Sequence, residues 1–191
     1  MQLNAVALAG YGTPQMSNEA SWAAVRGGAG ESLGSYTFIA DKIGAGNFSG
    51  CRTLLFFDTH LLANSKIISA KLVHPPIANF SNLDSGSVHI VTHAAPSTTI
   101  VTGDYDSGIG TTSFGSVALS SLSTTLTTDI TLNADGIAAI NKTGNTPIAL
   151  LSSFDFNNSE PASNGNEYTA DRSLFELVVV YKKLAGILEV F

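Results

Sequence analysis

Asp104 and Asp106 have the spacing in this sequence that most resembles a metal site. In "TGDYDSGIG" the two carboxylates occupy alternate positions, which can bring oxygen ligands to one calcium ion. The acidic ligand that closes an EF-hand loop does not follow, and a turn rich in Asp and Gly accounts for the same residues. The sequence therefore predicts a turn here, with Asp104 and Asp106 as weak calcium candidates and no assigned metal.

Asp155 and Glu160, in "DFNNSEP", are the carboxylates that could form a catalytic pair. A glycosidase holds two such groups across a cleft, usually beside aromatic platforms for the sugar. The chain has one Trp and five Tyr, and their positions do not converge on this segment. Because Asx and proline turn chemistry explains the segment as a loop, we expect scaffold here rather than an active site.

Other signatures of catalysis are weak or missing from the sequence. His89 and His93 are four residues apart in a strand-like segment, whereas zinc usually takes ligands at tighter, turn-based or helical spacing. Residues 30–34 read Gly-Glu-Ser-Leu-Gly, but no helix opens after this string as a Gly-x-Ser-x-Gly elbow requires, and the sequence has no nucleotide fingerprint. Cys51 is the only cysteine, which excludes an internal disulfide. The sequence therefore predicts a protein that is not an enzyme and uses no cofactor.

Four aromatic residues are candidates for ligand binding. Trp22, Tyr36, Tyr105 and Tyr168 could stack on sugar rings, as a carbohydrate-binding module would require. The alternative is that their rings pack in the core or at its rim, with the polar tips hydrogen-bonded. The sequence does not distinguish these alternatives, so glycans stay possible ligands.

The composition limits the partners of the chain. Charged residues make up 13% and hydrophobic residues 44%, and the formal net charge is -6 at pH 7. Because Lys and Arg do not cluster, there is no electrostatic footprint for nucleic acid. The first residues lack a basic n-region, and no apolar run reaches the length of a membrane span. We therefore expect synthesis in a cytoplasm and no contact with membranes.

Short apolar segments between turns rich in Ser, Thr and Gly predict an all-β fold. The strongest strand candidates are residues 52–59, 65–73, 86–95 and 174–181, and weaker ones are residues 4–12, 35–40, 98–103, 112–119 and 146–154. Residues 75–86 and 155–173 are expected to be loops. Eight or more short strands at regular spacing favour an antiparallel β-sandwich or jelly roll. We expect a single domain over residues 1–181, with residues 1–20 as an N-terminal strand or arm.

One short helix is predicted over residues 133–143, across a sheet edge. Asn133 is a good N-cap, and Asp135 lies in the first turn, where a negative charge complements the helix dipole. Ile137 and Ile140 are expected to face inward, and Gly144 to supply a left-handed stop.

The last ten residues, 182–191, form an apolar tail. Its hydrophobic residues are Leu184, Ile187, Leu188, Val190 and Phe191. Such a segment must be covered, either as an added edge strand of its own sheet or by a partner molecule. The sequence leaves both alternatives open.

The series "RTLLFFDT", "IISAKL", "LNADGIAAINKTGNTPIAL", "DFNNSEP" and "LFELVVVY" resembles a jelly-roll domain of phage virion proteins and bacterial surface proteins, the DNRLRE and carbohydrate-binding-module-like group. The resemblance covers about residues 21–181, and its most specific part is residues 132–150. It implies a β-sandwich that serves as an adhesive or decorating module, and it offers no catalytic residues.

Two functions follow from these observations. The first is a structural protein of a phage virion, a capsid decoration or cement protein on the outer capsid surface, which binds the major capsid protein and copies of itself, by analogy as a trimer. Leu3 and Val6 near the N-terminus and the apolar tail would then make the contacts. The alternative is a carbohydrate-binding or receptor-binding module of a tail or fibre, which would use exposed aromatic rings.

Overall fold

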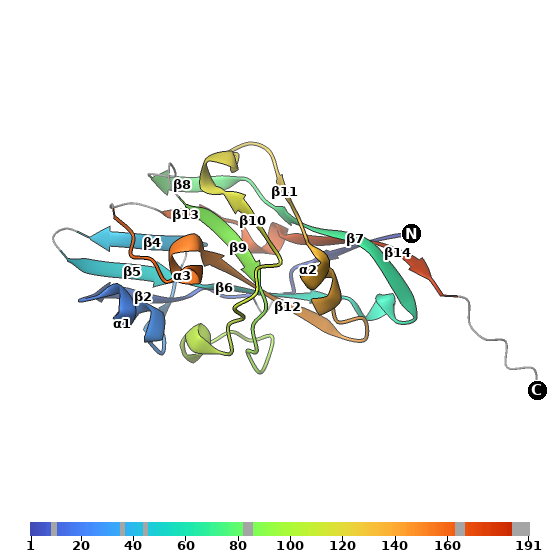
Figure 1. The fold of residues 1–191 in the computed structure, drawn as a ribbon, viewed down its shortest axis with the longest axis horizontal. Coiled ribbons are helices and arrows are strands. Elements are labelled where there is room, and N and C mark those ends of the chain that lie inside the picture. Colours follow the sequence, from blue (N-terminus) through green and yellow to red (C-terminus); the bar gives the residue numbers. More distant parts are fainter. Residues whose placement is uncertain (9–10, 35–36, 44–45, 82–85, 163–166, 185–191) are drawn as a thin grey trace, which may run out of the picture.

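The computed structural model describes residues 1–8, 11–34, 37–43, 46–81, 86–162 and 167–184. Every strand pairing within these ranges is antiparallel. The strands form an elongated body (Figure 1). None of the helices in the described ranges has the length and apolar character needed to cross a membrane.

Two four-stranded sheets form a β-sandwich. The first sheet comprises, in spatial order, β1 (Gln2–Val6), β14 (Glu176–Lys183), β7 (Ser65–His74) and β11 (Thr128–Thr131). The second comprises β10 (Gly115–Ala118), β9 (Ser87–Val91), β12 (Asn145–Ser152) and β6 (Thr53–Asp58). Successive strands change sheet repeatedly, and the first and last strands, β1 and β14, are neighbours. This is the strand order of a jelly roll, and it confirms the predicted antiparallel sandwich.

A third, six-stranded sheet extends the sandwich at the end opposite the N-terminus (Figure 1). It comprises, in spatial order, β3 (Ser32–Leu33), β2 (Pro14–Glu19), β5 (Asn47–Cys51), β4 (Phe38–Ile43), β13 (Glu167–Ala170) and β8 (Ile77–Ser81). Residues 75–86 and 155–173 were expected to be loops, and that expectation is wrong where β8 and β13 form. Ile77 and Tyr168 are buried in the core while their polar neighbours hide the strand pattern.

The two faces of β6 serve two different cores. Leu55 and Phe57 belong to the main core between the sandwich sheets, and the alternate residues Leu54 and Phe56 point to the opposite face. The segment between β9 and β10 covers that face. Residues 98–103, predicted as a strand, lie in this cover: Ile100 packs onto the sheet, and the 3-10 helix η2 (Thr102–Asp106) follows.

Short helices connect the strands: α1 (Trp22–Gly27), α2 (Ala134–Ala139), α3 (Ser153–Phe156), η1 (His60–Leu62), η3 (Leu119–Ser121) and η4 (Arg172–Leu174). The predicted helix at 133–143 is α2, capped by Asn133 as expected but ending at Ala139. Gly144 does not have a left-handed conformation. The helix ends early because Asn141 accepts hydrogen bonds from the N–H and hydroxyl of Thr143, which turns the chain toward β12.

Removing the cap of α2 is expected to cost about 1 kcal/mol of unfolding free energy. Oδ1 of Asn133 accepts a hydrogen bond of 2.9 Å from Gly136 N–H, and Nδ2 donates to the Ser113 carbonyl at 2.8 Å. Asn133→Ala removes both bonds, whereas Asn133→Asp keeps the acceptor at the helix end. Urea unfolding should therefore rank the stabilities as wild type, N133D, N133A. Equal midpoints for all three would contradict this role of the cap.

Candidate functional site

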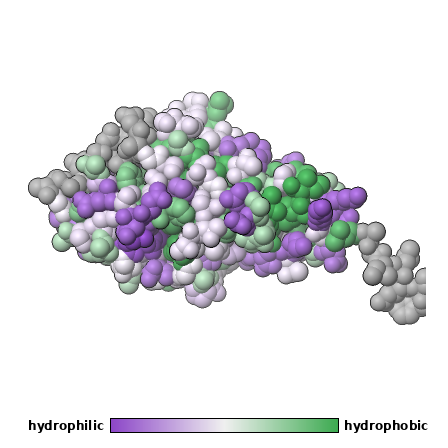
Figure 2. Space-filling model, viewed as in Figure 1, coloured by the Kyte–Doolittle hydropathy of each residue, from purple (hydrophilic) through white to green (hydrophobic). Residues whose placement is uncertain are grey.

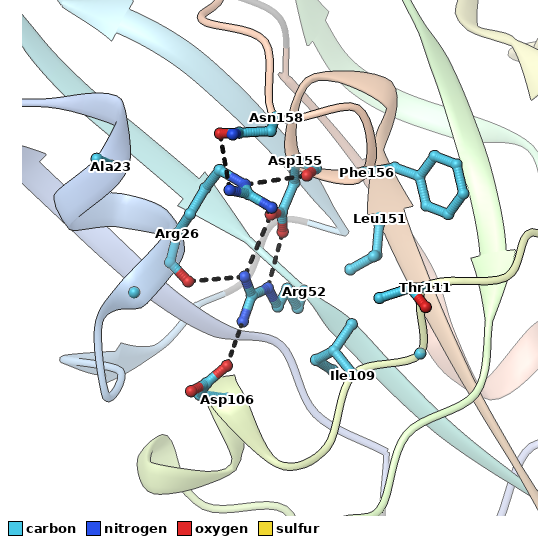
Figure 3. Close-up of a pocket in the computed structure, with 12 residues that line it drawn as sticks. Ala23, Arg26, Arg52, Asp106, Ile109, Thr111, Leu151, Asp155, Phe156 and Asn158 are labelled. Atoms are coloured by element: carbon cyan, nitrogen blue, oxygen red, sulfur yellow. Dashed lines mark hydrogen bonds and ion pairs between the residues drawn. The ribbon is translucent and has the colours of Figure 1, made fainter.

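The most connected buried charge in the described chain is Arg52, the single residue between β5 and β6 (Figure 3). It is 4% exposed. Its Nε and Nη2 donate to the two Asp155 carboxylate oxygens at 2.7 and 3.2 Å. Nη1 donates to the Tyr105 carbonyl at 2.8 Å and Nη2 to the Arg26 carbonyl at 2.9 Å. Arg52 thereby ties together α1, η2 and α3.

Asp155 is held by two guanidinium groups. It lies in the first turn of α3, where its N–H donates to Ser152 Oγ at 3.0 Å. Arg26 at the end of α1 donates from Nε to Asp155 Oδ1 at 3.1 Å and from Nη1 to Asn158 Oδ1 at 2.7 Å. Both oxygens of Asp155 therefore accept strong, charge-assisted hydrogen bonds. A carboxylate held in this way serves structure better than proton transfer.

The charge of Arg52 is stabilised in spite of its burial. Burial alone would lower the pKa of the guanidinium, but the hydrogen bond and charge of Asp155 outweigh it and raise the pKa. The guanidinium also lies over the Tyr105 ring, 4.2 Å from the ring centroid. Arg52 and Asp155 therefore form a charged pair inside the protein.

A cavity of about 420 Å³ lies beside this pair. Figure 3 shows the charged groups along one side of it and the apolar side chains of Ile109 and Leu151 on the other. Arg26 and Asp106, whose side chains are 31% and 68% exposed, are the charged groups most open to solvent there. The cavity can hydrogen-bond a small polar ligand, but its two arginines and two aspartates balance in charge.

The structure separates the two calcium candidates. Asp104 is buried and turns back on its own loop, where its carboxylate accepts hydrogen bonds from the Val101 N–H at 2.9 Å and the Ser107 hydroxyl at 3.1 Å. Asp106 instead faces Arg52 at 3.4 Å. Among the residues described, no cluster of three or more His, Cys, Asp or Glu side chains could hold a metal. Both residues lie in η2, so the structure has a short 3-10 helix where the sequence predicted a turn.

The aromatic candidates for sugar stacking lie in the core. Trp22, Tyr105 and Tyr168 are 4%, 1% and 0% exposed, and Tyr36 lies outside the described residues. Burial raises the pKa of the phenols of Tyr105 and Tyr168. Because both faces of a buried ring are packed against protein, the sugar-stacking expectation for these three residues does not fit the structure.

Three of the four histidines lie in or beside the cores, each in a separate place. His74 is buried in the main core, where Nδ1 donates to the Pro75 carbonyl at 2.7 Å and Nε2 accepts from the Tyr168 hydroxyl at 2.9 Å. His93 packs against Phe56 in the second core, on the face of β6 that carries Leu54 and Phe56. The ring of His89 stacks on Phe156, with 4.4 Å between the ring centroids. Burial lowers the pKa of all three, that of His74 to about 4. Each ring is therefore neutral near pH 7.

The N-terminus of the chain and the end of β14 are neighbours in space, but the predicted contact residues Leu3 and Val6 pair with Val179 and Glu176, away from Leu184. The Met1 amino group donates to the Tyr181 carbonyl at 2.9 Å, and the Tyr181 N–H donates to the Met1 carbonyl at 3.0 Å. Val6 and Leu184 are 56% and 57% exposed, and Leu3 is partly buried. The other predicted contacts lie outside the described residues: Ile187, Leu188, Val190 and Phe191.

A hydrophobic patch lies near this end of the molecule. Figure 2 shows it toward the right of the view, in the region of α2 and β7. A shallow cavity of about 230 Å³ there is lined by Ile67, Ile137 and Ala138 among others. Patches of this kind on a soluble domain are typical of contact surfaces.

Comparison with known proteins adds no relative. No protein-family model matches the chain, and no curated protein matches it significantly.

The sequence analysis did not identify Arg26 and Arg52 as residues of the candidate site, although one signal was present. Arg52 interrupts the apolar stretch "CRTLLFF", and a charge within a buried segment needs a partner.

Proposed function

We propose that this chain is a non-enzymatic structural protein of a phage virion. It is a capsid decoration or cement protein on the outer surface, and its partners are the major capsid protein and copies of itself. A cement protein stabilises a shell by burying surface across the joints between subunits, so that many modest contacts repeated by symmetry add up.

The observation that carries the proposal is the contact surface at one end of the sandwich. The N-terminal strand and the end of β14 lie side by side there, joined by the hydrogen bonds between Met1 and Tyr181. Met1 and Leu184 expose large apolar side chains at that end, whereas Val6 lies opposite Glu176 at the other end of β14. The most connected charges, Arg52 and Asp155, are instead engaged with the protein's own segments. This distribution favours binding through surface burial over chemistry in a cleft.

The alternative function is a carbohydrate-binding or receptor-binding module of a tail or fibre. The cavity beside Arg26 favours it, because Asp106, Asn158 and Thr111 offer hydrogen-bonding groups next to an apolar wall. In this form the alternative no longer depends on Trp22, Tyr105 or Tyr168.

The decoration role predicts that deletion of the gene lowers the temperature at which purified phage particles release their DNA, and that added protein restores it. Leu184→Glu should abolish the restoration, because it places a charge on the contact surface. The matched control is Leu174→Glu, since Leu174 is also 57% exposed but precedes β14. Particles that release DNA at the same temperature with and without the protein would contradict a cement role.

A further inference from the structure

The first residues of β7 are paired on one side only. On that side β14 pairs with β7 as far as Ser65. On the other side β11 pairs with residues 71–74, so residues 65–69 have no strand partner there among the described strands. Helix α2 contacts β7, and Lys142, which follows this helix, donates from Nζ to the Ser65 carbonyl at 3.3 Å. A groove therefore lies between the start of β7 and α2.

This groove is the shallow cavity of about 230 Å³ in the hydrophobic patch of Figure 2. Its apolar lining includes Ile67, Ile137 and Ala138, of which the two isoleucines are partly buried and Ala138 is exposed. Two exposed lysines, Lys66 and Lys142, also line it. An apolar segment that carries a negative charge would complement such a groove.

The described chain leads to the edge of this groove. The Leu184 N–H donates to the Asn64 carbonyl at 2.9 Å, and the next residue, Ser65, lines the groove. The sequence continues after Leu184 as AGILEVF, residues 185–191, with four large apolar residues and a single charge, the negative Glu189. An extended chain spans about 3.3 Å per residue, whereas neighbouring strands lie only about 4.8 Å apart. The segment 185–191 is therefore long enough to cross β7 and reach α2.

We propose that the segment 185–191 binds in this groove of its own chain. Its apolar side chains contact Ile67 and α2, and Glu189 lies beside Lys66 and Lys142. Because the segment is joined to β14, its effective concentration at the groove is in the millimolar range, which favours its own chain over a second copy. The proposal goes beyond the proposed function and does not rest on it, since it concerns the free protein.

The rate at which a maleimide labels a thiol placed in the groove tests the proposal on the full chain. Ala138→Cys introduces that thiol, and the native Cys51 is only 4% exposed, so it contributes little labelling. The bound segment should shield the thiol. Adding Ile187→Asp and Leu188→Asp places two charges in the apolar segment, and should raise the labelling rate of A138C by at least about tenfold by releasing the segment.

Leu61→Cys is the matched control. Leu61 is 56% exposed, and its carbonyl accepts from Lys183 Nζ at 2.8 Å, so it is close to the start of the segment. It does not line the groove. The two aspartate substitutions should therefore leave the labelling rate of L61C unchanged.

Charge reversal tests the position of Glu189. Glu189→Lys should raise the labelling rate of A138C, because it places a positive charge beside Lys66 and Lys142. Adding Lys66→Glu should lower the rate again by restoring an opposite pair.

Three results would overturn the proposal. The first is an A138C labelling rate that the aspartate substitutions do not change, and the second is an equal increase at A138C and L61C. The third is shielding of A138C that grows with protein concentration, which would show that the segment of another copy fills the groove. A circular dichroism spectrum equal to that of the wild type shows that each variant is folded. The copy number per virion tests the proposed function alone, so the two proposals fail separately.

Discussion

Arg52→Met is expected to lower the unfolding free energy by about 3 to 5 kcal/mol. The substitution keeps an apolar side chain but removes the guanidinium that binds Asp155, the Tyr105 carbonyl and the Arg26 carbonyl. Asp155, whose side chain is 7% exposed, would keep only its contact with Arg26. Urea unfolding at pH 7 measures the loss. A change below about 1 kcal/mol would contradict the role of Arg52 as the junction of α1, η2 and α3.

Two controls separate this role from the loss of any ion pair. Lys71→Met removes the Lys71–Asp129 pair, whose side chains are 39% and 53% exposed, and should cost less than about 1 kcal/mol. Combining Arg52→Met with Asp155→Leu removes both buried charges. That double variant should be more stable than the sum of the two single losses predicts, because neither charge is left buried without its partner.

The protein is expected to lose up to about 3 kcal/mol of stability between pH 6.5 and pH 4 through His74. Burial lowers the pKa of His74 from 6.5 to about 4, so within that window the unfolded chain binds a proton that the folded chain does not. The contribution is fully present above pH 6.5 and is lost as the pH falls toward 4. His89 and His93 act in the same direction.

His74→Gln tests this assignment, because glutamine can donate and accept hydrogen bonds but does not titrate. The variant should be less stable than the wild type at pH 7, and its stability should fall less between pH 6.5 and 4. An H74Q profile parallel to that of the wild type over this window would show that another group causes the acid sensitivity.

The sequence predicts the strands of the sandwich correctly where buried residues are continuous or alternate with exposed ones. Residues 52–59, 65–73 and 174–181 correspond closely to β6, β7 and β14, because these strands contain long apolar or alternating runs. The third sheet was harder to foresee. Its strands β8 and β13 are short and mix buried residues with Asn, Thr and Ser, so local composition favours a loop.

The cluster of Arg26, Arg52 and Asp155 could not be predicted from the pattern of neighbouring residues in the sequence. Arg26, Arg52 and Asp155 are far apart in the sequence and meet because α1, the β5–β6 joint and α3 converge at one side of the sandwich. The strand predicted at residues 98–103 is also wrong because of contacts between residues that are far apart in the sequence. Its periodicity reflects packing onto the outer face of β6 and β12 rather than strand pairing.

The measurement that tests the proposed function most directly is the copy number of this chain per virion, by quantitative mass spectrometry of particles purified from a phage that carries the gene. The decoration role predicts a fixed ratio to the major capsid protein, with the two chains present in comparable amounts. A few copies per particle would place the chain in a tail or fibre. Complete absence from the particles would contradict a virion role.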